Sequence, residues 1–438
     1  QAGTARVGVG PLPGAVGGAS GGAGGPAPPC AGGLVRGVAD GSGAVGGRVL
    51  AELGADVIKV EPPGGASDRG APPFLGDRAG PDRSLSWVAG NVNKRGITLS
   101  LDDPRGPALF ERLAATAAIV IESYAPGALE AKGLGYRRLS AERPQLVLVS
   151  ISPYGQDGPL AGFPGSDLEV TASSGSLWLA GEEDRPPVRT SQPQSPSWSG
   201  MYGAMGALMA YLAARTSGLG QQVDVSAQAS MATVHPPAPI FWDVLGEEHR
   251  RLGPFLLGRS IVGSRFRNLW PCADGYVSFA IQGGAIGRHT GRMLVDWMAS
   301  RGSVPAVFEG IAWEAFDNST LTQDEVDRLE AAIGPFLLGL TKREFYAGVI
   351  ERKMLGYPVG DAADALADPQ LAARGFWQTV AVDGEGGLPF PGGSMLFDGV
   401  RPTLRRAAPR LGEHNAEVYA EIGVGPGELR DLRAAGVL

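Results

Sequence analysis

Short strand-like runs alternate with helical segments through the first half of the chain, from about residue 49 to residue 227. The runs at residues 56–60, 119–122 and 145–152 are rich in Val, Ile and Leu, and helical patterns lie between them. Parallel strands need crossover connections, usually helices, so this alternation predicts a mostly parallel sheet. The pattern therefore indicates an α/β domain of the kind that carries nucleotide-like cofactors.

The 438 residues suggest two domains. After Gly246 the pattern changes to a hairpin at residues 270–279, with a type I′ turn expected at Asp274-Gly275, followed by helices. A strand at residues 378–382 and helices from His414 onward return to the earlier style. We expect a large domain from residues 34–246 and 366–438, and a smaller α+β domain from residues 247–365.

The first 33 residues are a Gly/Ala/Pro-rich stretch without hydrophobic period, which predicts a weakly ordered arm. A fold of this type normally begins with a strand. Residues 34–38 stand where that strand belongs, and the sequence there suggests that it has been lost or garbled.

Charge and cysteine content exclude several classes of function. The formal net charge is -7 and no Lys/Arg-rich run occurs, so a nucleic-acid partner is not expected. No run approaches the roughly 20 apolar residues that span a bilayer, and we expect no membrane partner. Two cysteines without a CxxC pair and four scattered histidines give no zinc ligand set. No secretory signal is recognised, and a reducing cytoplasm fits this pattern.

The common nucleotide motifs GxGxxG after a strand and GxxxxGK[ST] are absent, as are GxSxG and HExxH. A glycine-rich run, Gly41-Ser-Gly-Ala-Val-Gly-Gly47, precedes a helix. It is compatible with a phosphate cradle or with a plain tight turn.

Combinations of motifs are more informative than any single one. Six segments occur in order: Leu53-Gly-Ala-Asp-Val-Ile-Lys-Val-Glu-Pro-Pro-Gly-Gly65, Asn91-Val-Asn-Lys-Arg-Gly-Ile97, Glu122-Ser-Tyr-Ala-Pro-Gly-Ala-Leu129, Gly155-Gln-Asp-Gly-Pro159, Gly218-Leu-Gly-Gln221 and Leu411-Gly-Glu-His414. In this order and spacing they resemble the family III CoA-transferases, which include formyl-CoA and carnitine CoA-transferases; α-methylacyl-CoA racemases share the fold. The resemblance covers residues 50–438.

The resemblance implies a Rossmann-like large domain built from both chain ends, a small domain between them, and two chains interlocked as rings. It implies an acyl-CoA thioester as substrate, with no permanently bound cofactor. The turn Ser123-Tyr124-Ala-Pro-Gly127 would leave the carboxyl end of a parallel strand, where α/β sheets bind ligands. Tyr124 would lie against CoA and Leu99 would line the nucleotide pocket. The phosphates would meet Lys94, Arg95 or Lys132.

In this family an aspartate attacks the acyl thioester and forms a mixed anhydride. The released thiolate then returns to give an enzyme-bound thioester, from which the acceptor acid takes the CoA. The expected position of that aspartate, counted back from Gly218, falls on Pro196, or on Ser195 if the loop is one residue longer. Neither side chain can form the anhydride. The racemase pattern Gly-His-Asp is also broken, because Ser166 stands before Asp167.

Three interpretations follow. The chain is the non-nucleophilic subunit of a heteromeric CoA-transferase, as in the benzylsuccinate-type branch, whose pattern the stretch from Trp270 to Gly287 resembles. Alternatively, Asp167 or Glu169 takes over the reaction, although we expect Asp167 to cap its own helix. The third interpretation is a catalytically silent acyl-CoA-binding homologue.

The remaining histidines and the second cysteine favour structural roles. His235 precedes two prolines, His414 begins a helical region, and Cys272 precedes a turn. Trp198 differs from these residues because it lies in the loop where the nucleophile is expected.

Overall fold

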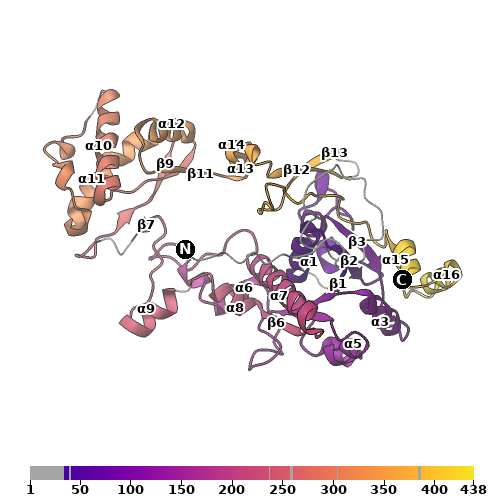
Figure 1. The fold of residues 1–438 in the computed structure, drawn as a ribbon. Helices are drawn as coiled ribbons and strands as arrows, with labels where there is room; N and C mark the ends of the chain where they lie inside the picture. Colours follow the sequence, from indigo (N-terminus) through magenta and orange to yellow (C-terminus); the bar gives the residue numbers. More distant parts are fainter. Residues whose placement is uncertain (1–33, 39–40, 236, 257–259, 303, 383–385) are drawn as a thin grey trace, which may run out of the picture. The chain divides into compact units, whose positions relative to one another are not determined.

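The computed structural model describes residues 34–38, 41–235, 237–256, 260–302, 304–382 and 386–438 (Figure 1). The arm expected at residues 1–33 lies outside these ranges. The chain divides into two compact units. The first takes in the described residues up to Ser176, together with Thr190–Pro237 and Gln370–Leu438, and the second consists of Leu177–Arg189 and Ala238–Pro369. The boundary expected after residue 246 thus lies after residue 237, and Leu177–Arg189 belongs to the second unit.

A six-stranded parallel sheet forms the centre of the first unit (Figure 1). Its order is β3-β2-β1-β4-β5-β6, and the strands are β1 (Leu34–Val38), β2 (Asp56–Glu61), β3 (Lys94–Thr98), β4 (Ile119–Glu122), β5 (Val147–Ser152) and β6 (Gln222–Ser226). The interpretation of residues 34–38 as a lost strand was wrong, because β1 pairs with both β2 and β4. The strand order reverses between β1 and β4, where open α/β sheets form ligand crevices.

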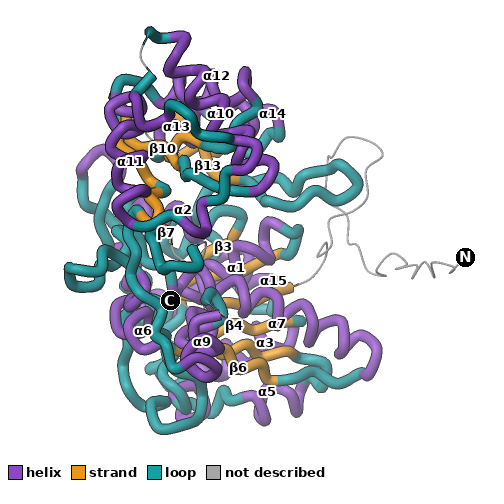
Figure 2. The backbone as a smooth tube through the Cα atoms, turned by 90° about the vertical axis from the view of Figure 1, so that its left-hand side faces the viewer, coloured by secondary structure: helices purple, strands orange, loops and turns teal. Residues whose placement is uncertain are grey.

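Strands β4 and β5 in this sheet are buried along their whole length, which explains why their residues are mostly apolar. Side chains alternate between two hydrophobic clusters: Val57 belongs to one and Ile58 to the other, and Ile121 and Val120 are divided in the same way. Figure 2 shows helices running beside these strands. The helices of this part are α1 (Ser42–Glu52), α2 (Leu85–Asn91), α3 (Gly106–Thr116), α4 (Ala128–Ala131), α5 (Tyr136–Glu142), α6 (Asp167–Ser173), α7 (Ser195–Ser217) and α8 (Ala227–Ala232).

The C-terminal segment returns to the first unit and seals the outer strand β3. It contains β12 (Trp377–Val382), β13 (Gly386–Pro391), α15 (Asn415–Glu421) and α16 (Pro426–Ala434). The Asn415 side chain accepts from Thr98 N at 2.8 Å and donates to Thr98 Oγ1 at 2.8 Å, and the buried Tyr419 hydroxyl donates to Thr98 O.

The second unit packs helices against a small antiparallel sheet of β9 (Leu269–Cys272), β10 (Gly275–Ser278) and β11 (Tyr357–Val359). The hairpin expected at residues 270–279 is present, but its central turn residues are Ala273 and Asp274. Neither has a positive φ, so the turn is not type I′ as expected. The other elements are α9 (Pro237–Leu245), β7 (Phe255–Leu256), β8 (Phe266–Arg267), α10 (Gly284–Ser300), α11 (Gln323–Leu338), α12 (Lys342–Arg352), α13 (Ala362–Ala367) and α14 (Pro369–Ala373), which spans the boundary between the two units.

None of the helices in the described ranges combines the length and the apolar character needed to cross a bilayer.

Candidate functional site

A cavity of about 500 Å³ opens at the carboxyl ends of β2, β3 and β4; we call it the strand-end cavity. Leu99, Ser123, Tyr124 and Lys132, which the sequence assigned to the coenzyme, all line it. The complete lining is Val60, Glu61, Pro62, Gly65, Ala66, Ser67, Leu99, Ser100, Leu101, Asp102, Ser123, Tyr124 and Lys132. Because all six strands run in parallel, their carboxyl ends meet at one edge, and the cavity lies where this fold class binds ligands.

The turn after β4 is held by a buried carboxylate. Glu122 Oε2 accepts the backbone N–H of Tyr124 at 2.8 Å. Burial raises the pKa of the Glu122 carboxyl, and the nearby Asp224 carboxylate acts in the same direction, while hydrogen bonds from Ser150 and Tyr124 oppose the shift. Gly127 does not line the cavity. Its φ of 79° turns the chain into α4, at whose end Lys132 stands.

Lys132 is the only cation among the residues lining the strand-end cavity, and it is paired. Its Nζ lies 2.5 Å from Asp102 Oδ1; the Lys132 side chain is 29% exposed and that of Asp102 is 89% exposed. The Glu61 carboxylate is buried and bound by the Arg69 guanidinium at 2.6 and 2.8 Å, so its charge is matched inside the protein. An anionic ligand in this cavity would therefore compete with Asp102 for Lys132.

Lys94 and Arg95 are not part of this cavity. They begin β3, whereas Leu99 follows its end, so they lie at the opposite edge of the sheet. Lys94 Nζ is buried and donates to Ala44 O, Gly90 O and Asn91 Oδ1 at 2.7–2.9 Å. The expectation that they meet phosphates is corrected, because both cations are engaged within the fold.

Arg95 supplies the ionic contact between β3 and the C-terminal helix α15. Its guanidinium pairs with Asp56 at 2.5 Å, with Glu417 at 2.7 Å, and with Glu421. The side chain is only 6% exposed. Its role is to fasten the end of the chain to the sheet.

The expected nucleophile position lies at the start of α7. Ser195 is the first helical residue and is buried, and Pro196 follows it. The Asp167 carboxylate lies against this position: Oδ1 accepts from Gln194 N at 2.9 Å, from Ser195 N at 2.8 Å and from Ser195 Oγ at 2.8 Å. Asp167 therefore caps α7.

The expectation that Asp167 caps its own helix is corrected. Ser166 caps α6, accepting from Leu168 N, and the Glu169 carboxylate accepts the Ser166 N–H at 2.9 Å to complete a capping box. The hydrogen bond from the Ser166 hydroxyl lowers the pKa of Glu169. Glu169 is therefore committed to the start of α6.

The glycine-rich run before α1 packs two helices together. A Cβ on Gly200 would lie 2.6 Å from Ser42 O, and one on Gly46 would lie 3.0 Å from Gly200 O. Ser199 Oγ donates to Ser42 Oγ at 2.9 Å. Residues 39 and 40, just before this run, lie outside the described ranges. In the described residues, these glycines allow α1 and α7 to pack in close contact.

The remaining candidates have structural surroundings. His414 Nδ1 accepts the Gly96 N–H at 3.1 Å, and burial lowers the pKa of this imidazole. Cys272 is buried, which raises the pKa of its thiol. The Trp198 side chain is 37% exposed, and His235 is half-buried. The described residues contain no group of three or more His, Cys, Asp or Glu side chains that could hold a metal.

The sequence missed most of the loops that form the strand-end cavity. Glu61 ends β2, Gly65 and Ser67 follow it, and Ser100 and Asp102 follow β3. These loops could have been predicted as ligand-binding segments, because each one follows the carboxyl end of a strand in a parallel sheet.

Comparisons with known proteins agree with this architecture. The model of CoA-transferase family III matches residues 40–415. The succinyl-CoA:(R)-benzylsuccinate CoA-transferase subunit BbsE of Thauera aromatica is 34% identical over 92% of this chain and 97% of its own. The succinate–glutarate CoA-transferase of Agrobacterium fabrum is 30% identical over 86% of this chain and 91% of its own.

Solved structures show the same fold. A CAIB/BAIF family protein from Brucella suis superposes with a TM-score of 0.77 at 27% identity, covering 90% of this chain and 99% of that one. The Rv3272 protein of Mycobacterium tuberculosis reaches a TM-score of 0.70 at 22% identity, covering 90% of this chain and 99% of its own. The match across most of the chain, together with the order of its motifs, shows that the chain belongs to CoA-transferase family III.

Proposed function

We propose that this chain is the acyl-CoA-binding subunit of a heteromeric CoA-transferase and that a related subunit supplies the nucleophilic aspartate. The observation that carries the proposal is the start of α7, where Ser195 and Pro196 stand at the aspartate's expected position. The Asp167 carboxylate nearby holds this turn through three hydrogen bonds to one oxygen.

The first turn of α7 is satisfied within the protein. Ser197 N and Trp198 N both donate to Gln194 O at 3.1 Å, and Ser195 N donates to Asp167. Pro196 has no N–H. The described geometry therefore leaves no first-turn amide of α7 free to stabilise an acyl-group oxyanion.

The proposed reaction moves CoA from a donor such as succinyl-CoA to an aromatic or branched organic acid. The partner's carboxylate would attack the thioester carbonyl and expel the CoA thiolate. That thiolate would attack the anhydride at the partner's own carbonyl, releasing the donor acid and leaving a CoA thioester on the partner. The acceptor carboxylate would expel the thiolate again, and the thiolate would attack the acceptor's carbonyl, giving the new CoA thioester and freeing the partner's carboxylate. The names of the relatives support this assignment, because one is a subunit and two act on succinyl or succinate groups. In an interlocked dimer of this chain with its partner, one site that contains the nucleophilic aspartate would suffice for CoA transfer. We place the reaction in the cytoplasm, as the cysteine pattern suggests.

A second candidate is a self-sufficient transferase, isomerase or racemase that uses Asp167. It is favoured by one observation: the Asp167 carboxylate lies 2.8 Å from Ser195 Oγ, next to the position where the family's aspartate belongs. Against it stands the use of that carboxylate as a helix cap.

Trapping of the covalent intermediate separates these candidates. The chain is purified alone and after co-expression with an aspartate-bearing family III chain from the same genome. Each preparation is treated with succinyl-CoA and hydroxylamine, and hydroxamates are located by mass spectrometry. We expect transfer only in the pair, with the hydroxamate in the partner.

Transfer by the purified chain alone, abolished by Asp167→Asn, would establish the second candidate instead. A chain that binds CoA but does not transfer it, either alone or with a family III partner, would be a catalytically silent acyl-CoA-binding homologue, and the proposal would be wrong.

A further inference from the structure

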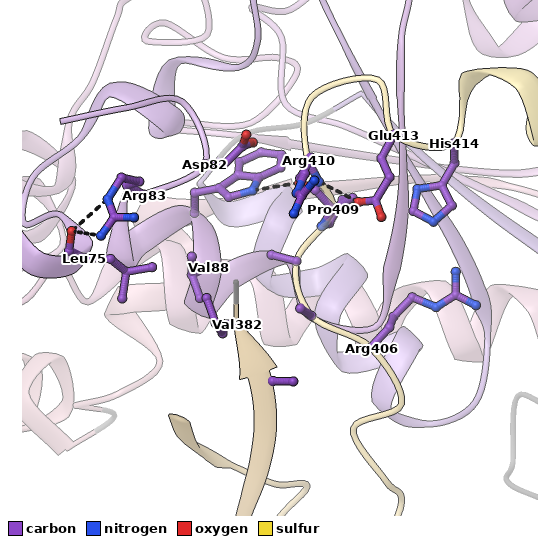
Figure 3. Close-up of a pocket in the computed structure, with 14 residues that line it drawn as sticks. Leu75, Asp82, Arg83, Val88, Val382, Arg406, Pro409, Arg410, Glu413 and His414 are labelled. Carbon is purple, nitrogen blue, oxygen red and sulfur yellow. Dashed lines mark hydrogen bonds between the residues drawn. The ribbon is translucent and has the colours of Figure 1, made fainter. Parts of the chain in front are cut away.

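The first unit contains another cavity, of about 560 Å³, between α2, the end of β12 and the C-terminal segment; we call it the tail cavity. It shares no lining residue with the strand-end cavity. Figure 3 shows Leu75 and Arg83 on one side, with Arg406, Glu413 and His414 on the other. The lining is Leu75, Asp82, Arg83, Trp87, Val88, Ala381, Val382, Arg406, Ala407, Ala408, Pro409, Arg410, Glu413 and His414.

One wall of the tail cavity is apolar. Leu75, Trp87 and Val88 are buried members of one hydrophobic cluster, and Val382 and Ala407 pack against it. A flat, apolar wall of this kind suits an aromatic or aliphatic body, as in most small-molecule sites.

The charges around the tail cavity are predominantly positive. Three arginines line it, at positions 83, 406 and 410, against two carboxylates, those of Asp82 and Glu413. Asp82 Oδ1 lies 2.5 Å from the Arg69 guanidinium, a cation outside the lining that Asp82 shares with Glu61. Glu413 Oε2 accepts the backbone N–H of Arg410 at 2.8 Å.

Arg406 stands out among these cations. Its backbone is fastened to Asn93, which donates to Arg406 O at 3.0 Å and accepts from Arg406 N at 3.2 Å. Its exposed guanidinium, in contrast, makes no hydrogen bond or ion pair with any residue in the described part of the chain. Burial is the main cause that lowers the pKa of the neighbouring His414, and the positive charge of Arg406 acts in the same direction. The Arg406 backbone is fixed by Asn93, and its guanidinium can therefore bind an anion without breaking a contact within the described residues.

We propose that the tail cavity binds a small organic monocarboxylate, with its carboxylate at Arg406 and its apolar body against the Trp87–Val88 wall. This site is additional to the CoA site proposed above and does not depend on it.

Trp87 lines the tail cavity, so its fluorescence should report ligand binding there. The Arg69 guanidinium lies 3.6 Å from the centre of the Trp87 ring, and the indole N–H donates to Pro409 O at 3.3 Å. Since Arg69 binds both Asp82 and Glu61, a ligand that moves this wall should also be felt at the strand-end cavity.

The test uses benzoate as the probe and benzamide as its uncharged match, titrated calorimetrically into the full-length chain. We expect saturable benzoate binding at least about tenfold tighter than benzamide binding, as a charge-assisted contact provides. Arg406→Gln should abolish that preference. Ala407→Phe, which fills the cavity and leaves the charges intact, should weaken both ligands. Benzoate should also change the tryptophan fluorescence, and Trp87→Phe should remove that change.

Arg137→Gln, an exposed arginine on α5 outside both cavities, is the matched control and should bind benzoate as the native chain does. CoA binding is measured on the same preparations. It should be unaltered by Arg406→Gln in the absence of benzoate, which keeps this test independent of the proposed function. Equal affinity for benzoate and benzamide, or equal weakening by Arg406→Gln and Arg137→Gln, would refute the tail-cavity site.

Discussion

Asp167 Oδ1 lies 2.8 Å from Ser195 Oγ, joining the first residue of α6 to the first residue of α7 across 28 positions of sequence. The same oxygen accepts the Gln194 and Ser195 amides. A carboxylate thus sits beside the position where the family's chemistry needs one, but its hydrogen bonds give it the task of starting a 23-residue helix.

Replacing Asp167 should cost stability more than chemistry. Asp167→Ala removes an acceptor of three hydrogen bonds, and we expect the free energy of unfolding to fall by about 2 kcal/mol. Asp167→Asn keeps an acceptor oxygen and should lose about half as much. Urea unfolding measures both. In the heteromeric enzyme Asp167→Asn should keep most of its CoA-transfer rate, and loss of transfer with unchanged stability would make Asp167 catalytic.

Pro196→Asp should give this chain a nucleophile. Position 196 lies in the first turn of α7, where the helix dipole stabilises a negative charge, so the fold should accept the change. We expect a hydroxamate at residue 196 after treatment with succinyl-CoA and hydroxylamine. Pro196→Asn, which matches the shape without the carboxylate, should give none. A variant that folds and binds CoA yet is never labelled would show that more than the aspartate is missing.

Lys132 and Asp102 should have opposite effects on coenzyme affinity. Lys132→Gln removes the only cation among the described residues that line the strand-end cavity, and it should raise the Kd for CoA about five- to tenfold. Asp102→Asn frees Lys132 and should lower the Kd. Calorimetric titration at two salt concentrations measures both, and the Lys132 effect should shrink at high salt. Unchanged affinity in both variants would place the coenzyme elsewhere.

Strands β4 and β5 could be predicted from sequence because strands that are buried on both faces are mostly apolar. β4 and β5 fall within the runs expected for them. β1 was missed because Leu-Val-Arg-Gly-Val carries an arginine and a glycine and follows a glycine-rich stretch, which weakens the local strand signal. Only its pairing with β2 and β4 establishes it as the centre of the sheet.

The candidate site was predictable where it follows from strand direction. Ser123 and Tyr124 leave the carboxyl end of β4 and reach the strand-end cavity. Lys94 and Arg95 were misplaced because a positive charge in a sequence does not reveal which internal acceptors will engage it. The Asp167–Ser195 contact joins residues far apart in the chain, so no local pattern could indicate it.

Lys94 should prove structural. Lys94→Met leaves two buried acceptors and one part-buried acceptor without their donor, and we expect a loss of about 3 kcal/mol in the free energy of unfolding. The Kd for CoA of the fraction that remains folded should not change. A raised Kd at unchanged stability would return Lys94 to the phosphate-binding role that the structure argues against.

Because of Glu122, the free energy of unfolding should increase as the pH falls through the acid range. Because burial raises its pKa in the folded protein, the folded state binds a proton more readily than the unfolded state. Its contribution is therefore fully present below the unfolded pKa of a glutamate and is lost as the pH rises through the folded pKa. Glu122→Gln keeps an acceptor for Tyr124 N and should remove this pH dependence, raising stability at pH 7 relative to the native chain. Urea unfolding across the acid range measures the effect; parallel stability curves for the two proteins would show that Glu122 does not titrate in the folded state as its burial implies.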